Sequence, residues 1–186
     1  MSFLSQPLKS SVEVCGKEYA INTDFRVWLR IYDILQEENG DSKKLMAGIV
    51  MCFKGGELPP SFSATVDAMT DFLFGCKASN EANGQEVKEK RSKKVFDFSK
   101  DAELIYASFL ADYGIDLTCE SMHWHKFLVL FKHLSKDTPF MQVVAIRSMN
   151  PADIKDTKMR EEIIKKQRMY ALDAPCDFAE ELFRII

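Results

Sequence analysis

Apolar residues recur at helical spacing through residues 101–147, the most informative stretch of the chain. Two strongly apolar segments are joined by Tyr113-Gly114-Ile115-Asp116-Leu117, where the aromatic residue and the glycine predict the end of a helix. A third segment opens at Thr138-Pro139, and proline is favoured at the first position of a helix. We therefore predict three packed helices, capped at the start by Ser99, with the central helix over about 119–135.

Ahead of this block, residues 11–22 alternate between apolar and polar positions on either side of a glycine. Short alternating runs are typical of β-strands, and Cys15-Gly16-Lys17 supplies a turn between them. We expect a small antiparallel hairpin here. Because two strands alone are only marginally stable, helices of the same chain are expected to cover it.

Residues 23–76 predict three N-terminal helices separated by clear stop signals. The first helix is capped by Thr23 or Asp24. The second follows Asn39-Gly40-Asp41 and has the sequence KKLMAGIVMCFK, and the third begins at Ser61 after a pair of prolines. These helices provide the apolar surface that the hairpin needs.

The segment 77–95 has the composition of a linker, since it is polar, rich in Asn, Glu and Lys, and without periodicity, and we expect a mobile loop. Residues 96–186 return to helices, including a long charged helix after Asn150-Pro151 and an amphipathic one over 176–186. The predicted fold is mainly α-helical, a single helical domain over 1–186 with a small N-terminal β-hairpin.

The composition supports one soluble domain and argues against several functions. A chain of 186 residues with 46% hydrophobic and 28% charged residues is ordinary for a globular protein. Its net charge of −3 argues against a general nucleic-acid binder, which needs a basic face to displace counterions from phosphates. The five scattered cysteines are typical of reduced, intracellular thiols. No apolar run reaches the roughly 18–20 residues of a membrane span, and no signal-peptide pattern opens the chain.

Candidates for a metal site or a nucleophile gather near the central helix. A spacing of four residues places Cys119 and His123 on one helix face, whereas His125 lies about 200° around the helix from His123. That face offers two ligands and a structural site needs four, so His133 or Cys176 would have to be brought in by folding. A nucleophilic pair of Cys119 and His123 lacks an orienting acid and an oxyanion loop. We predict no metal site, no catalytic residues and no enzymatic activity.

Nucleotide and nucleic-acid motifs are equally incomplete. Neither GxxxxGK[ST] nor GxGxxG occurs, so no cofactor is expected. The basic run over 88–94 is interrupted by acid and contains no aromatic residue for base stacking, which favours a solvated loop over a nucleic-acid patch. A small nucleic-acid-binding regulator using this loop is kept as an alternative.

Interaction features are stronger than catalytic ones. Aromatic and apolar side chains recur on one face of the 119–135 helix and of the terminal helix over 176–186. Such faces either pack on the core of their own chain or enter a partner's groove, and buried aromatics dominate the energetics of interfaces. The predicted partner-binding anchors are Trp124, Phe127 and Phe131 on the first helix and Phe178, Leu182 and Phe183 on the second.

The order of these signals resembles a family of small tail-module proteins, the "gp fifteen" family of siphophages of Gram-positive bacteria. The resemblance covers most of the chain apart from the 77–95 loop and the part beyond about residue 150. YGIDL and HW-x-x-F at this separation are its most specific pieces. One departure is His125, where the family pattern leads us to expect a second aromatic residue after Trp124. The matching segments are residues 21–26, 101–109, 113–117, 122–127, 137–140 and 146–147.

The resemblance implies a non-enzymatic function in phage tail formation. It implies a tail assembly chaperone or allied morphogenesis factor that acts in the host cell cytoplasm. Its partner would be the long, aggregation-prone tape-measure protein, and the tail-tube protein is a second candidate partner. The alternative implied by the same resemblance is a structural tail or connector subunit retained in the virion. Neither function involves binding to a membrane or to a nucleic acid.

Overall fold

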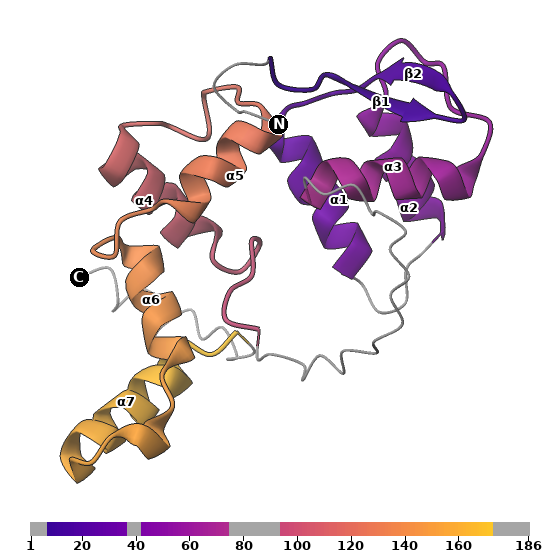
Figure 1. The fold of residues 1–186 in the computed structure, drawn as a ribbon. Coiled ribbons are helices and arrows are strands. Elements are labelled where there is room, and N and C mark those ends of the chain that lie inside the picture. The colour runs from indigo at the N-terminus through magenta and orange to yellow at the C-terminus, as the bar shows by residue number, and fades with distance from the viewer. Residues whose placement is uncertain (1–6, 37–41, 75–93, 173–186) are drawn as a thin grey trace. The chain divides into compact units, whose positions relative to one another are not determined.

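A computed structural model describes residues 7–36, 42–74 and 94–172 of the chain (Figure 1). Within these ranges it contains seven α-helices, one short 3-10 helix and a two-stranded antiparallel sheet. The predicted class, mainly α with a small N-terminal β-hairpin, is confirmed. None of the helices in these ranges is long and apolar enough to cross a membrane.

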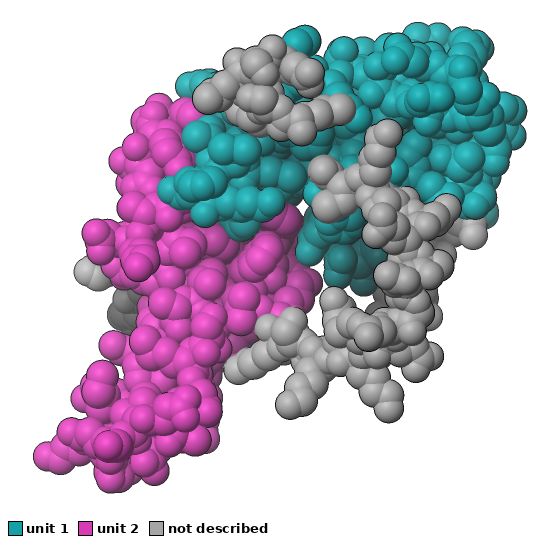
Figure 2. All heavy atoms as spheres, viewed as in Figure 1, with its two compact units in different colours: residues 1–88, 117–133 teal, residues 89–116, 134–186 magenta. Residues whose placement is uncertain are grey.

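The chain forms two compact units that alternate along the sequence (Figure 2). Unit 1 comprises residues 1–88 and 117–133, and unit 2 comprises residues 89–116 and 134–186. Each unit is described by itself below. The single domain expected over 1–186 stays a prediction, as does the mobile loop over 77–95, of which only 94 and 95 are described.

The hairpin of unit 1 pairs β1 (Ser11–Val14) with β2 (Lys17–Ala20), as predicted. Val12 lies opposite Tyr19, and both are buried. The two turn residues adopt left-handed backbone, with φ of 52° at Cys15 and 78° at Gly16. Two successive positive φ values match the two-residue turn that follows the natural twist of a hairpin.

Four helices complete unit 1: α1 (Phe25–Gln36), α2 (Ser42–Cys52), α3 (Phe62–Phe74) and α5 (Trp124–Lys132). Helices α1 and α2 pack on each other, and the absence of a side chain at Gly48 allows their close approach. The largest fully buried side chains of this unit include Trp28, Trp124 and Phe127.

Hydrogen bonds in unit 1 also connect the start of α1 to the segment before α5. Phe25 N–H donates to the Met122 carbonyl at 2.9 Å, and Trp124 N–H donates to the Thr23 carbonyl at 2.7 Å. The Arg26 guanidinium donates to the carbonyls of Leu117, Thr118 and Glu120 at 2.8–3.2 Å. Two of the segments that carried the family resemblance therefore hold each other in place.

Unit 2 contains α4 (Ala102–Tyr113), α6 (Pro139–Ser148), a 3-10 turn (Pro151–Asp153) and α7 (Thr157–Met169). Gly114 ends α4 at a φ of 64°, so the predicted stop is confirmed. Helix α6 begins at Pro139 as expected, but the hydroxyl group that caps it belongs to Ser108 of α4, which accepts from Phe140 N–H at 3.1 Å.

Three predicted boundaries are wrong. The central helix runs over Trp124–Lys132 rather than 119–135, because Cys119 lies in a turn and the backbone of Met122 and Trp124 is hydrogen-bonded to the start of α1. Ser99 does not cap α4, whose N-cap is Asp101. Asn150-Pro151 opens only a 3-10 turn, and the charged helix begins later, where the Asp156 carboxylate accepts from two backbone N–H groups.

Candidate partner interface

The aromatic side chains predicted to anchor a partner on α5 belong mainly to the core of unit 1. Trp124 and Phe127 are each only 1% exposed, and neither offers surface to a partner in this conformation. The Phe127 ring stacks on Phe25 with centroids 4.9 Å apart and on Phe131 at 5.9 Å. Phe131 is half-buried, so it is the described anchor with accessible surface.

Trp124 and His125 have a second structural task at the C-terminal end of α3. The Trp124 indole N–H donates to the Leu73 carbonyl at 2.9 Å, and His125 Nε2 donates to the Phe72 carbonyl at 2.8 Å. The last four carbonyls of a helix have no partner within the helix, and α3 ends at Phe74. The two rings therefore satisfy carbonyl groups that the helix leaves open.

His125 occupies a position at which we expected another aromatic ring, and it packs like one. Its ring lies 4.4 Å from the Phe72 ring, centroid to centroid. Burial lowers the pKa of His125 below its usual 6.5, the hydrogen bond to Phe72 raises it, and nearby His123 and Lys9 lower it further. The neutral imidazole is thus the form that fits this site.

His123 uses both ring nitrogens within unit 1. Nδ1 accepts from His125 N–H at 3.1 Å, and Nε2 donates to the Lys9 carbonyl at 2.9 Å. Since Cys119 precedes α5, the idea that Cys119 and His123 share a helix face is wrong. His125 also lies beside His123 rather than pointing away, with ring centroids 5.4 Å apart. Across residues 7–36, 42–74 and 94–172, no three His, Cys, Asp or Glu side chains converge to hold a metal ion.

The surface of α2 that faces away from α1 is apolar. Met46 and Val50 are 44% and 53% exposed, and Ala47 and Met51 are exposed beside them. On the opposite side of the helix, Gly48, Ile49 and Cys52 are buried. We call Met46, Ala47, Val50 and Met51 the outer face of α2.

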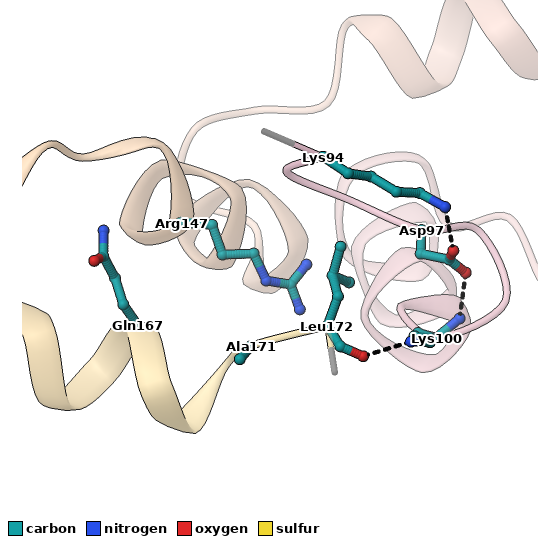
Figure 3. A pocket seen from close by; sticks show the side chains of 7 residues that line it. All are labelled: Lys94, Asp97, Lys100, Arg147, Gln167, Ala171 and Leu172. Carbon is teal, nitrogen blue, oxygen red and sulfur yellow. Dashed lines mark hydrogen bonds and ion pairs between the residues drawn. The ribbon is translucent and has the colours of Figure 1, made fainter. Parts of the chain in front are cut away.

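Unit 2 contains an open pocket of about 290 Å³ between the segment before α4, helix α6 and the end of α7 (Figure 3). Its cationic side chains are already engaged. Lys94 pairs with Asp97 at 2.6 Å, and Lys100 Nζ donates to the Leu172 carbonyl at 2.6 Å. Arg147 is held by a buried carboxylate and two carbonyls. This arrangement stabilises the unit and leaves little charge for an anionic ligand. The lining residues are Lys94, Asp97, Lys100, Arg147, Gln167, Ala171 and Leu172.

Several predicted residues lie outside the described part of the chain. These are the anchors Phe178, Leu182 and Phe183 of the terminal segment, Cys176, and all of the 88–94 run except Lys94. Their proposed roles stay predictions.

Two features were missed by sequence reasoning. The first is the outer face of α2, for which a signal existed: LMAGIVMC has an apolar residue or glycine at every position, more than one buried face can use. The second is the buried ion pair of Asp101 and Arg147. These residues are 46 positions apart, and no local pattern connects them.

Comparison with models of protein families matches residues 4–172 to the family described as "Bacteriophage Gp15 protein". The match covers most of both units and ends at the last residue that the structure describes. Comparison with curated proteins found no match, and neither did comparison with solved structures.

Proposed function

From the premise that this chain belongs to the bacteriophage Gp15 protein family, we propose that it is a tail assembly chaperone, or an allied tail-morphogenesis factor, that binds the tape-measure protein through apolar helix faces. Family membership makes it a phage protein. The role in tail assembly, the partner and the action in the host cell cytoplasm are our proposal. So is the absence of enzymatic activity.

The observation that carries the proposal is the outer face of α2. Met46 and Val50 expose about half of their surface on a helix whose other side is buried. Fully burying a large apolar side chain is worth roughly 1.5–3 kcal/mol, so a half-exposed one forgoes part of this free energy. Exposed apolar helix faces are suited to partners, and unbranched methionine adapts to irregular apolar surfaces. A chaperone for a long helical chain needs such an adaptable surface.

Co-expression with the tape-measure protein of the same phage tests the proposal. The tape-measure protein is expected to be insoluble alone and to become soluble and co-purify with this chain. Substituting Met46→Glu and Val50→Glu should abolish both effects. The matched control is Met149→Glu with Met159→Glu, which places the same charges on methionines of unit 2 that are 44% and 56% exposed. If the tape-measure protein stays insoluble and does not co-purify with the native chain, the proposal is overturned.

A second measurement separates this function from that of a virion subunit. An assembly chaperone leaves before the particle is complete, so mass spectrometry of purified virions should not detect this chain at the level of tail proteins. Detection at a fixed stoichiometry would instead support a structural tail or connector subunit.

A further inference from the structure

We infer that the hairpin of unit 1 binds an extended, basic segment of a partner protein, which adds to the outer edge of β1 as a further strand. This edge is separate from the outer face of α2 and takes a strand instead of a helix, so it is a second binding site beyond the proposed function. Unpaired backbone groups of β1 and two facing glutamates beside them mark the site.

The register of the hairpin fixes which backbone groups of β1 point outward. Ile21 N–H donates to the Ser10 carbonyl at 2.9 Å, so these two residues form a hydrogen-bonded pair. In an antiparallel sheet such pairs alternate with pairs whose backbone groups point away from each other. Ser11 and Glu13 belong to the second kind. Their N–H and carbonyl groups therefore lie on the outer edge of β1.

The opposite edge of the hairpin, along β2, is already paired. Lys54 N–H donates to the Ala20 carbonyl at 2.9 Å, and Asn22 N–H donates to the Cys52 carbonyl at 2.6 Å. The chain at the end of α2 therefore closes this edge, and a further strand has access to the hairpin only along β1.

The edge along β1 is closed only just before the strand begins. There, His123 Nε2 donates to the Lys9 carbonyl at 2.9 Å. Within the described part of the chain, no hydrogen bond reaches the outward backbone groups of Ser11 and Glu13. Unpaired strand edges bind extended segments through backbone hydrogen bonds. Both N–H groups and both carbonyls are thus available to an added antiparallel strand.

The two faces of the hairpin differ in the side chains that they present. Val12 and Val14 are buried on one face, and α3 packs against β1. Glu13 and Glu18 lie directly opposite each other on the other face, and both are exposed. Among the residues that the structure describes, neither carboxylate has an ion-pair or hydrogen-bond partner. The exposed face therefore carries uncompensated negative charge.

The glutamate pair selects a basic strand. Like charges at directly opposite positions destabilise a sheet, so this pair does not serve the stability of the hairpin. A residue of the added strand opposite Glu13 would lie on the same face as both carboxylates. Lysine or arginine there would complement them and fix the register of the strand. Lys9 is on this face too, but it lies four residues from Glu13, roughly 13 Å along the strand.

The bound segment should alternate in character. It needs a basic residue opposite Glu13, an apolar residue beside Val12 on the buried side, and a small hydroxyl residue opposite Ser11. A second copy of this chain fits poorly. Antiparallel pairing of two β1 edges would bring the glutamate pairs of both hairpins onto one face of the sheet, where like charges oppose association.

Binding of synthetic peptides to the full chain tests the inference. The first peptide alternates valine with lysine and threonine, and the second has glutamate in place of lysine. The first should bind at least about tenfold more tightly, with an affinity that falls as salt rises. Glu13→Lys with Glu18→Lys should reverse this preference. Glu161→Lys with Glu162→Lys makes the same charge change on exposed positions of α7 and should leave the preference as it is.

N-methylation of the first peptide separates strand addition from simple charge attraction. In the antiparallel arrangement, the N–H groups of its lysine and threonine residues point to β1, and those of its valines point away. Methylation of the lysine and threonine nitrogens should weaken binding at least about tenfold, whereas methylation of the valine nitrogens should change it by less than about threefold.

Variants of the chain locate the effect on β1. Ser11→Pro removes an N–H that points outward and none that pairs with β2, a position at which a strand tolerates proline. It should weaken binding of the first peptide at least about tenfold, while circular dichroism shows an intact fold. Met46→Glu with Val50→Glu should leave binding unchanged, because the outer face of α2 is a different site.

Equal binding of the two peptides, equal effects of the two methylation patterns, or binding that persists in a folded Ser11→Pro variant would overturn the inference. Self-association of the native chain that is lost in Ser11→Pro would also overturn it, in favour of a second copy. Failure of the tape-measure pull-down alongside selective binding of the lysine peptide would contradict the proposed function only.

Discussion

Arg147 and Asp101 form a buried, two-point ion pair in unit 2. Guanidinium nitrogens of Arg147 donate to the two carboxylate oxygens of Asp101 at 2.7 and 2.9 Å. The remaining bonds of the guanidinium go to the carbonyls of Tyr170 at 2.6 Å and Val95 at 3.2 Å. One side chain of α6 thus connects the start of α4 with the chain before it and with the end of α7.

Removing the arginine alone should be costly. In Arg147→Met the Asp101 carboxylate stays buried without its counterion, a situation that typically costs about 3–5 kcal/mol. Urea unfolding of the variant should show this loss. The double variant Arg147→Met with Asp101→Leu should recover part of it, because no charge is then left buried. A loss below about 1 kcal/mol in the single variant would mean that the pair contributes little to stability.

Sequence patterns correctly predicted the helix ends that depend on the conformational preference of a single residue. Gly114 ends α4 because a positive φ suits glycine, and Pro139 begins α6 because its fixed φ suits the first turn. The central helix was predicted too long because residues 119–123 have an acceptable helical pattern. Backbone hydrogen bonds of Met122 and Trp124 go instead to Phe25 and Thr23, about 100 positions earlier in the chain.

The candidate site was harder to predict than the fold. Periodicity identified an apolar face on α5 but missed the exposed apolar face of α2, because which face is exposed depends on the contacts of Phe127 and Gly48 with distant elements. Trp124 is of a residue type that often anchors interfaces, but its side chain is buried like that of a core residue. Burial is a tertiary property, and residue type alone does not fix it.

Gly48 is expected to be limited in size by its contact with α1. Gly48→Leu should destabilise unit 1 by about 1–3 kcal/mol, because a larger side chain must displace Ile34 and Ile31. In Gly48→Ala, a gain in helix propensity of about 1 kcal/mol is opposed by a tight contact of 3.2 Å with the flexible end of Ile34. The net change in the free energy of unfolding should be small. Adding Ile34→Val, which shortens the contacting side chain, should make the Gly48→Ala substitution stabilising. Urea unfolding of the three variants provides the comparison, and a Leu variant as stable as the native chain would argue against close packing here.

Helix α7 should depend on its N-cap. The Asp156 carboxylate accepts from Lys158 N–H at 2.8 Å and from Met159 N–H at 3.3 Å. Asp156→Ala should therefore lower the free energy of unfolding of unit 2 by about 1 kcal/mol. Asp153→Ala removes the same charge from an exposed position three residues earlier and serves as the control. Equal effects of the two substitutions would indicate a general charge effect instead of a cap.

Cys52 should resist alkylation while the protein is folded. Burial raises the pKa of its thiol to about 12 from the usual 9.0, so only about one molecule in 10,000 carries the thiolate at pH 8. Cys15 and Cys119 are exposed. Peptide mass spectrometry after iodoacetamide treatment at pH 8 should find these two modified and Cys52 intact, with all three modified in urea.

The same pKa shift predicts a loss of stability in alkaline solution. The folded state favours the protonated thiol, so its contribution is complete below pH 9 and is lost as pH rises from about 9 to about 12. Cys52→Ala should reduce this part of the pH dependence. Rapid alkylation of Cys52 under native conditions would contradict both expectations.

His125 should make the folded state sensitive to mild acid. Because burial lowers its pKa below 6.5, the folded protein favours the neutral ring. This contribution to stability is complete above pH 6.5 and is lost as pH falls through the lower, folded-state pKa. His123 and Lys9 face the same ring and add to the cost of protonating it.

The test is a pH series of urea unfolding for the native chain and for His125→Gln. The glutamine amide can donate to the Phe72 carbonyl but does not titrate, so the variant should lack the part of the acid sensitivity that begins below pH 6.5. His133→Gln is the control, since His133 is exposed and its Nδ1 donates only to the Val129 carbonyl one turn earlier. Carboxylates protonate in all three proteins, so the difference between the curves, and not their common decline, reports on His125. If the His125→Gln curve follows that of the native chain, the neutral ring at the end of α3 is not a source of stability.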